Sequence, residues 1–255
     1  MPLPLYRSRW WSHDFERPYI VLGMHRSGTS WLSRVLHDSG VFMGMLQEKN
    51  AESIPFLSLN QQALIAQGGD WIDPVVLESR AFARWSPRDL YREHLKLGIN
   101  ARLWIRFKAN YRWGWKDPRN VFAAAAWRDR FPKARWIHVY RDGREVAMSL
   151  WNRNRKPGEV HDPRLDDLVF CFRLWERYLV QMEDWEHRGF PCITVSYAAL
   201  IEGKGWRHLE QSLGFRLNVV PTLQAQGPFE PQRSFPESLE EAARNSPVFE
   251  RWMSR

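Results

Sequence analysis

A short apolar segment followed by a glycine-bracketed loop constrains the fold of this chain more than any other feature. Residues Tyr19–Leu22 form an apolar run typical of a buried strand, and the loop Gly23–Ser30 contains glycines that permit a sharp turn. An amphipathic helix is expected to follow, to about His37. Such a strand, loop and helix aim several backbone N–H groups at one place near a helix N-terminus, where an anion is favoured. The segment therefore predicts a phosphate-binding loop.

The position of the positive charge in this loop limits which phosphate it can bind. The spacing of Gly23 and Gly28 fits the P-loop of nucleotide-binding proteins, in which a lysine follows the second glycine. Here that position holds Thr29, and the cation stands earlier, at Arg26. The loop is therefore expected to bind a phosphate other than the β- and γ-phosphates of a triphosphate. Taken alone, it could also be a Gly/Ser-rich turn without a ligand.

The length and composition of the chain are those of an ordinary globular protein. With 255 residues, 44% of them hydrophobic and 26% charged, it is expected to form an irregular N-terminal arm (1–17) and a single domain (18–255). No run of about 20 apolar residues predicts a membrane span, and the N-terminus lacks the apolar core of a signal peptide. Cys171 and Cys192 are the only cysteines, so neither a disulfide framework nor a cysteine-based zinc site is expected. A reducing cytoplasm is the predicted location.

The formal net charge of the chain is +8. Such a balance suits an anionic ligand or partner, but a generally solvated basic surface explains it equally well. Most of the 15 tryptophans are expected in the core or along a groove, because each supplies a large apolar area and one N–H donor.

Strands and helices alternate along the rest of the sequence. The hydrophobic pattern and the turn residues predict further strands at 113–116, 134–140 and 192–195. Helices are predicted at 54–66, 86–109, 120–130, 143–151, 165–187, 206–213 and 238–244, and 152–163 is expected to be a mobile, basic surface loop. This order predicts an α/β three-layer sandwich with a central parallel sheet and helices on both faces. Its ligand should lie at the carboxyl ends of the strands.

A second pair of polar residues follows the strand predicted at 134–140. Arg141 stands directly after this strand, and Ser149 lies about two helical turns further on. An arginine fork and a serine hydroxyl can both bind one anion. In isolation, the two could equally be a surface arginine at a helix start and an unrelated serine.

Taken together, the two motifs resemble those of sulfotransferases that use 3′-phosphoadenosine 5′-phosphosulfate (PAPS), and the bacterial type in particular. The first loop of this family, which grips the 5′-phosphosulfate, is matched here by Arg26, Ser27, Gly28, Thr29, Ser30 and Trp31. Arg141 and Ser149 match the second motif, which holds the 3′-phosphate. The resemblance covers roughly residues 18–215 and implies a P-loop nucleotide hydrolase-like fold.

The resemblance also implies roles for residues outside these two motifs. Lys116, in a segment similar to the Lys-Asp-Pro segment of protein-tyrosine sulfotransferases, would approach the transferring group. Glu52 matches a glutamate of bacterial sulfotransferases and would be the base that takes the acceptor's proton; Glu48 and a histidine are the alternatives. Trp31 and Tyr197 would contact the adenine.

Two histidines, His25 and His138, are expected to have different roles. His25 lies in the first loop, where it can touch a substrate or serve only in packing or capping. His138 falls within a predicted core strand and is expected to be structural.

The features together imply a PAPS-dependent sulfotransferase that needs no metal. The sulfuryl group would pass by in-line attack to a hydroxyl or amine of a small-molecule, sugar or lipid acceptor, not of a nucleic acid. Arg26 and Lys116 would stabilise charge on the sulfuryl and leaving oxygens. Two alternatives stay open. One is a P-loop kinase-like phosphotransferase, for which Asp142 is a poorly placed metal ligand, and the other is a non-catalytic nucleotide- or polyanion-binding protein.

Overall fold

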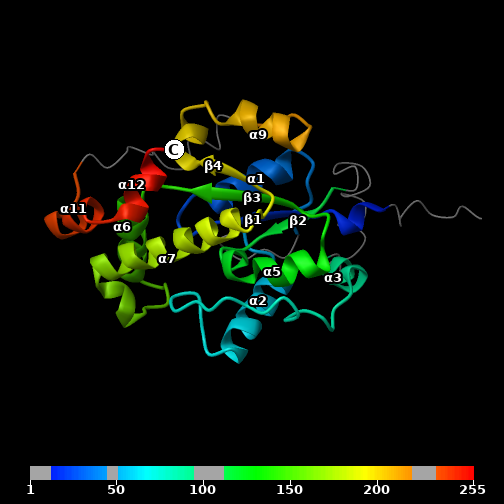
Figure 1. The fold of residues 1–255 in the computed structure, drawn as a ribbon, viewed down its shortest axis with the longest axis horizontal. Coiled ribbons are helices and arrows are strands. Elements are labelled where there is room, and N and C mark those ends of the chain that lie inside the picture. Colours follow the sequence, from blue (N-terminus) through cyan, green and yellow to red (C-terminus); the bar gives the residue numbers. More distant parts are fainter. Residues whose placement is uncertain (1–12, 45–50, 95–111, 220–233) are drawn as a thin grey trace, which may run out of the picture.

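A four-stranded parallel sheet forms the centre of the protein. The computed structural model describes residues 13–44, 51–94, 112–219 and 234–255. The strands lie in the order β2 (Gly114–Lys116), β1 (Tyr19–Leu22), β3 (Arg135–Tyr140) and β4 (Cys192–Ser196) (Figure 1). All three pairings are parallel, so the carboxyl ends of the four strands meet at one edge of the sheet. The predicted α/β architecture is confirmed.

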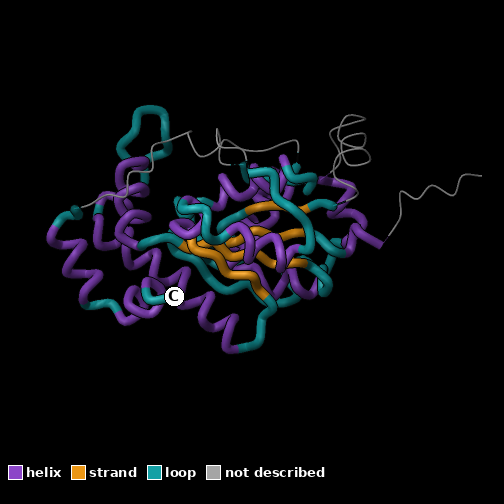
Figure 2. Tube along the Cα trace, turned by 90° about the horizontal axis from the view of Figure 1, so that it is seen from above, coloured by secondary structure: helices purple, strands orange, loops and turns teal. Residues whose placement is uncertain are grey.

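Helices cover both faces of this sheet because its strands bury alternate side chains on opposite sides. Tyr19 and Val21 of β1 pack into one core with helices α1 (Thr29–Asp38) and α9 (Trp206–Leu213). Ile20 and Leu22 of the same strand face a second, larger core. That core is completed by helices that include α2 (Ile54–Ala66), α5 (Asn120–Arg130), α6 (Gly143–Asn154), α7 (Leu168–His187) and α11 (Glu237–Arg244). Figure 2 shows the strands enclosed between helices.

Aromatic side chains fill much of the larger core, as expected from the number of tryptophans. Phe56 of α2 stacks on Trp115 of β2, with ring centroids 3.9 Å apart and planes 5° from parallel. Trp127 of α5 meets Phe56 edge to face at 5.4 Å. Within the described part of the chain, the fully buried tryptophans are Trp113, Trp115, Trp127, Trp136, Trp175 and Trp252.

The predicted helix ends are wrong in two places, at the end of α6 and at the start of α7. Helix α6 continues to Asn154, so the start of the expected loop 152–163 is helical. A 3-10 turn, Pro163–Asp166, comes next, and α7 begins only at Leu168 because the carboxylate of Asp167 accepts bonds from two N–H groups of its first turn. The predicted helix 86–109 begins as α3 (Pro87–His94), and the remainder lies outside the described residues.

Short elements complete the described structure. The expected arm contains a 3-10 turn, His13–Glu16, next to α3. Helix α8 (Tyr197–Ile201) begins directly after β4. Helix α12 (Pro247–Met253), which the sequence reading missed, places Trp252 against Tyr140 of β3. No helix among the described residues has the length and apolar character needed to cross a bilayer.

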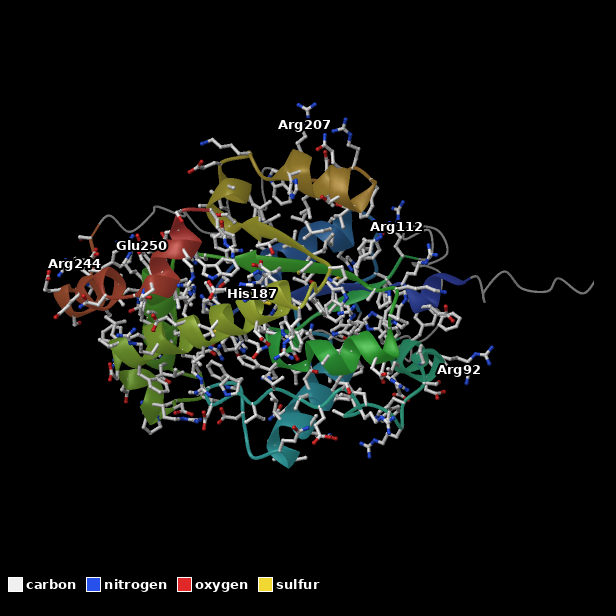
Figure 3. The ribbon with its side chains drawn as sticks, in the orientation of Figure 1. Arg92, Arg112, His187, Arg207, Arg244 and Glu250 are labelled. Carbon is white, nitrogen blue, oxygen red and sulfur yellow. The ribbon has the colours of Figure 1, made fainter. Side chains whose placement is uncertain are left out.

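The basic side chains are spread widely over the surface. Figure 3 shows Arg92 and Arg207 pointing away from the fold, at distant positions. Other arginines pair with nearby carboxylates, such as Arg251 with Glu183 at 2.7 Å. The net charge of +8 therefore does not by itself mark a binding site.

Candidate functional site

The first loop leaves β1 at the centre of the sheet and leads into α1. Gly23 and Gly28 both have positive φ, at 141° and 91°, which favours glycine at these positions. A Cβ atom on Gly23 would overlap the carbonyl oxygen of Val139, and one on Gly28 would overlap the ring of Tyr197. The two glycines therefore let the loop lie against β3 and against the start of α8.

The loop ends at a helix N-terminus suited to an anion. Helix α1 begins at Thr29, after Gly28, and its first turn carries no acidic side chain. The first N–H groups of a helix point outward along its axis, so this end attracts negative charge. The hydroxyl of Ser27 is buried and has no partner among the described residues.

Arg26 joins the two predicted phosphate motifs. Its Nε donates to the hydroxyl of Ser149 on α6 at 2.8 Å, although 123 residues separate the two. Its carbonyl oxygen accepts a bond of 3.2 Å from a guanidinium nitrogen of Arg141. Arg26 has a φ of 70°, which is uncommon for a residue with a Cβ. Arg26 is exposed, yet desolvation of its guanidinium by surrounding protein atoms, and then the charges of Arg153 and Arg141, lower its pKa.

Arg141, Tyr197 and Trp31 form the adjoining wall of the site. Arg141 pairs with Glu145 at 2.7 Å, and its guanidinium carbon lies 5.0 Å from the ring centroid of Tyr197. Trp31 meets the Tyr197 ring edge to face at 5.8 Å. The indole N–H of Trp31 is buried without a partner among the described residues. The structure thus brings the residues predicted to bind the two ends of one nucleotide into one cluster.

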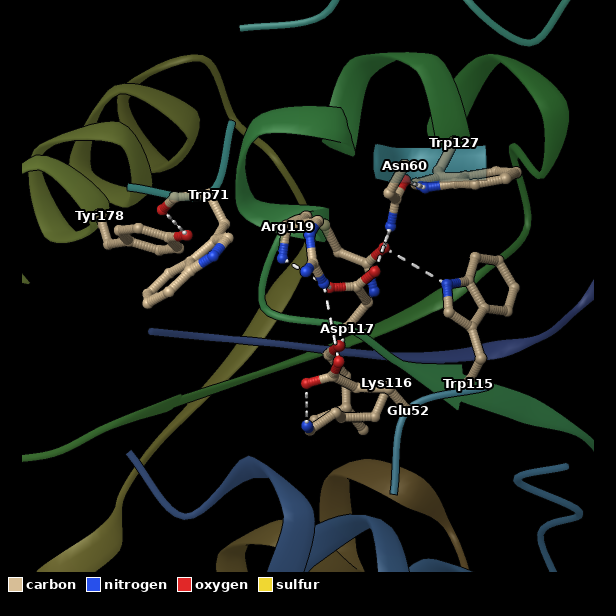
Figure 4. Close-up of polar contacts among 11 residues, drawn as sticks. Glu52, Asn60, Trp71, Trp115, Lys116, Asp117, Arg119, Trp127 and Tyr178 are labelled. Atoms are coloured by element: carbon tan, nitrogen blue, oxygen red, sulfur yellow. Dashed lines mark hydrogen bonds and ion pairs between the residues drawn. The ribbon is translucent and has the colours of Figure 1, made fainter. Parts of the chain in front are cut away.

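Glu52 and Lys116 form a buried ion pair beside this cluster (Figure 4). Lys116 ends β2, Glu52 precedes α2, and their side chains are each 2% exposed. The Lys116 ammonium donates to Glu52 at 2.9 Å, and Arg119 approaches the other oxygen of Glu52 at 3.6 Å. Burial lowers the pKa of Lys116, and Glu52 partly offsets this effect. Ala51, just before Glu52, has a φ of 60°.

A second buried carboxylate balances the charge of this group. Arg119 also pairs with Asp117 at 3.0 Å, so two cations face two anions. Burial raises the pKa of Asp117, whereas the pKa of Arg119 is raised because Asp117 and Glu52 outweigh the effect of burial. The charges in this group are thus paired with one another, as burial requires.

Asn60 of α2 holds the group in place through hydrogen bonds. Its amide donates to Asp117 and to Asn120, both at 2.9 Å, and its oxygen accepts from the indole of Trp127 at 2.9 Å. Asn120 in turn donates to the carbonyl oxygen of Val21 in β1 at 3.1 Å. Asn60 and Arg119 were not among the predicted site residues, although both stand within segments that the resemblance singled out.

His25 lies between the two groups of charges. Its ring packs 4.5 Å from the ring of Trp71, and its Nε2 is buried without a partner among the described residues. The pKa of His25 lies well below its ordinary value, first through burial and then through four surrounding cations: Arg119, Lys116, Arg153 and Arg26. The imidazole is therefore neutral at pH 7. His138, in contrast, is buried in β3 against Trp252, as expected for a core residue.

The alternative base, Glu48, lies outside the described residues. Among the described residues, no group of three or more His, Cys, Asp or Glu side chains is arranged to hold a metal ion. Both cysteines are free thiols.

The comparisons with known proteins agree with this fold. Residues 18–204 match the model of the sulfotransferase family. Since this match spans most of the sequence, the chain belongs to the sulfotransferase family. A comparison with curated proteins gives no significant match.

Solved sulfotransferases share the fold. The sulfotransferase from Alicyclobacillus acidocaldarius superposes with a TM-score of 0.53 at 12% identity, covering 94% of this chain and 96% of the other. Sulfotransferase STF1 from Mycobacterium tuberculosis H37Rv gives a TM-score of 0.50 at 15% identity, covering 91% and 76%. At such identities the likeness extends to the fold alone.

Proposed function

We propose that this protein transfers a sulfuryl group from PAPS to an acceptor hydroxyl or amine. The observation that carries the proposal is the hydrogen bond of 2.8 Å between Arg26 of the first motif and Ser149 of the second. Two anion-binding motifs that are far apart in sequence meet at one edge of the sheet. This suits a nucleotide with phosphate groups at both its 5′ and 3′ positions.

The first loop would hold the 5′-phosphosulfate. The N–H groups at the start of α1, with the hydroxyls of Ser27, Thr29 and Ser30, would donate to the 5′-phosphate. Arg141 and Ser149 would bind the 3′-phosphate, for which an arginine fork is well shaped. The adenine would lie against Trp31 and Tyr197.

The transfer would proceed by in-line attack. The acceptor oxygen forms a bond to sulfur while the bond from sulfur to the bridging oxygen breaks, and 3′-phosphoadenosine 5′-phosphate (PAP) leaves. Arg26 and Lys116 would stabilise negative charge on the sulfuryl and bridging oxygens. Glu52 would take the proton that the acceptor loses. We propose no metal for this step.

Two side chains, Glu52 and His25, can be compared directly as the base. Glu52 is bonded to Lys116 at 2.9 Å, whereas His25 is neutral and has a buried, unpartnered Nε2. If Glu52 is the base, Glu52→Gln lowers the rate of transfer at saturating PAPS much more than His25→Gln does. A larger loss in His25→Gln would assign the proton to His25 instead.

The competing P-loop kinase-like function would need a metal-binding carboxylate. Asp142, the candidate, caps α6 by accepting from the N–H of Arg144 at 2.8 Å and pairs with its guanidinium at 2.7 Å. These contacts give Asp142 a local structural role and favour the sulfotransferase proposal.

Calorimetry with PAP and with Mg–ATP tests the choice of nucleotide. We expect PAP to bind and Mg–ATP to bind far more weakly; tight Mg–ATP binding without PAP binding would contradict the proposal. Binding of oligonucleotides that weakens steeply with salt and is unaffected by PAP would indicate a polyanion-binding protein.

The acceptor class and the location stay proposals. We propose a small-molecule, sugar or lipid acceptor. We also propose a reducing cytoplasm as the location, with which the two free thiols are consistent. Transfer of labelled sulfate from PAPS to components of a cell extract, followed by mass spectrometry, would identify the acceptor. A protein that binds PAP and transfers sulfate to nothing would be a non-catalytic binder.

A further inference from the structure

Arg153 lies close to the candidate site, although neither sequence motif includes it. It stands on α6 one turn beyond Ser149, on the same face of the helix. This face looks onto the first loop, because Ser149 accepts a hydrogen bond from Arg26. Arg153 Nε contacts the carboxylate of Glu159 at 3.3 Å, and the two side chains are 27% and 20% exposed.

The charge of Arg153 acts on both Arg26 and His25, and that of Glu159 acts on Arg26. Arg153 lowers the pKa of Arg26 and also that of His25, while Glu159 raises the pKa of Arg26. Because such effects weaken with distance, both charges must lie near the first loop. The carboxylate of Glu159 thus stands beside two arginines at the place where a ligand anion would be bound.

Glu159 belongs to a turn whose base is fixed. The side chain of Asn154 is buried, and it donates to the carbonyl oxygen of Asp162 at 2.9 Å and accepts from its N–H at 2.8 Å. These two bonds hold the ends of the segment 155–161 together, while Val160 at its tip is 89% exposed. The carboxylate of Glu159 can therefore be displaced from Arg153 without opening the base of the turn.

We propose that Arg153 is a further anion-binding residue of this site, and that Glu159 is an internal carboxylate which a phosphate or sulfate group of the ligand replaces. The inference rests on the proposed function for the identity of the ligand. A partly exposed ion pair contributes little net stability, so a phosphate with a larger charge and more acceptor oxygens can replace the carboxylate.

Four variants test the proposal: Glu159→Gln, Arg153→Gln, the double variant, and Glu202→Gln as a control. Glu202 pairs with Lys204 on the surface and is 55% exposed. PAP affinity is measured by calorimetry, and thermal unfolding checks that each variant folds. Arg153→Lys, which keeps the charge and loses the fork, serves as a second variant.

The expected result is a change of opposite sign in the two single variants. Glu159→Gln should bind PAP about threefold more tightly, because it removes a competitor worth no more than an exposed ion pair. Arg153→Gln should bind about tenfold more weakly, and Arg153→Lys should lie in between. The gain from Glu159→Gln should shrink when Arg153 is also replaced. Unchanged affinity for both PAP and inorganic sulfate in both single variants, or weaker PAP binding in Glu159→Gln, would overturn the proposal.

A second arm identifies the source of the anion. Inorganic sulfate is titrated into the PAP-saturated protein as a stand-in for an anionic acceptor. Variant effects on PAP affinity assign Arg153 to the donor, and effects on sulfate affinity alone assign it to the acceptor. If wild-type protein fails to bind PAP but binds pyrophosphate with the same variant pattern, the proposed function fails and this inference stands. If all variants bind PAP and transfer sulfate like the wild type, the proposed function stands and this inference about Arg153 fails.

Discussion

Arg26 adopts a backbone conformation that few residues with a Cβ atom accept. The left-handed conformation costs such a residue about 1 kcal/mol, yet it directs the Arg26 carbonyl to Arg141 and its guanidinium to Ser149. The other non-glycine residue with positive φ in the described chain is Ala51, next to Glu52. Strained residues of this kind gather at functional sites, and here both adjoin residues proposed for catalysis.

Replacing Arg26 tests its proposed role at the reacting group. Arg26→Ala should lower the rate of sulfate transfer about a hundredfold, or roughly 3 kcal/mol, because a fixed cation facing the developing charge is lost. The measurement is steady-state transfer from PAPS. Arg34→Ala is the matched control, since Arg34 is an exposed residue of the same helix α1 region, and its turnover should equal that of the wild type. Equal turnover in both variants would remove Arg26 from the mechanism.

The Lys116–Glu52 pair should be far more important for stability than a surface pair. Lys116→Met leaves a buried carboxylate with only the longer contact to Arg119, and should lower the free energy of unfolding by about 3 kcal/mol. Lys133→Met breaks the exposed pair with Glu16 and should cost at most about 1 kcal/mol. Urea unfolding of both variants measures the difference. Similar losses of unfolding free energy in the two variants would mean that burial does not determine how much the Lys116–Glu52 pair contributes to stability.

At the scale of elements, close packing against the first loop sets its shape. Gly28→Ala should weaken PAP binding and lower the melting temperature, because a methyl group would overlap the ring of Tyr197. Gly203→Ala is the matched control: Gly203 also has a positive φ, of 81°, but a Cβ there meets nothing within 4 Å. The Gly203→Ala variant has the backbone strain of a positive φ without a steric overlap. It should therefore be less stable than the wild type and bind PAP with the same affinity. Calorimetry of the two variants separates strain from contact.

Helix boundaries were predictable where proline or glycine residues stand at the ends of a helix. The expected strand 19–22 and the helices 54–66, 120–130 and 206–213 have the predicted bounds. The start of α7 was placed too early because Leu165, in the preceding 3-10 turn, is buried and continues the helical pattern of apolar residues. Only the capping bonds of Asp167 define the true start.

At the scale of the whole molecule, buried neutral histidines make stability depend on pH. Burial lowers the pKa of His138 to about 3 and that of His94 to about 4. The unfolded chain, with histidine pKa values near 6.5, then binds more protons than the folded chain between about pH 3 and 6.5. Their contribution to stability is full above pH 6.5 and is lost as the pH falls through this window.

His138→Leu isolates this effect. At pH 4.5 the wild-type His138 should cost about 3 kcal/mol of unfolding free energy relative to pH 7, and the variant should lack that part of the pH dependence. Urea unfolding at the two pH values gives the comparison. His208→Gln, at an exposed position, should leave the pH dependence unchanged. An identical pH dependence in the wild type and His138→Leu would show that His138 is not the group responsible.

The local parts of this protein follow from short stretches of its sequence. Residues Tyr19–Trp31 contain the strand, the loop and the helix start in one continuous stretch, so spacing and residue type suffice to predict them. The Arg141–Ser149 pair is equally local. For the same reason the family resemblance could be seen, and the family match confirms it.

How these parts combine depends on contacts between residues that are far apart in the sequence. Lys116 meets Glu52 across 64 residues, and Arg26 meets Ser149 across 123, because β1 lies between β2 and β3 in a parallel sheet. Strand order and the pairing of buried charges depend on long-range packing, which no local pattern encodes. That packing places Arg119, Asn60 and Arg153 beside residues that the motifs had already identified.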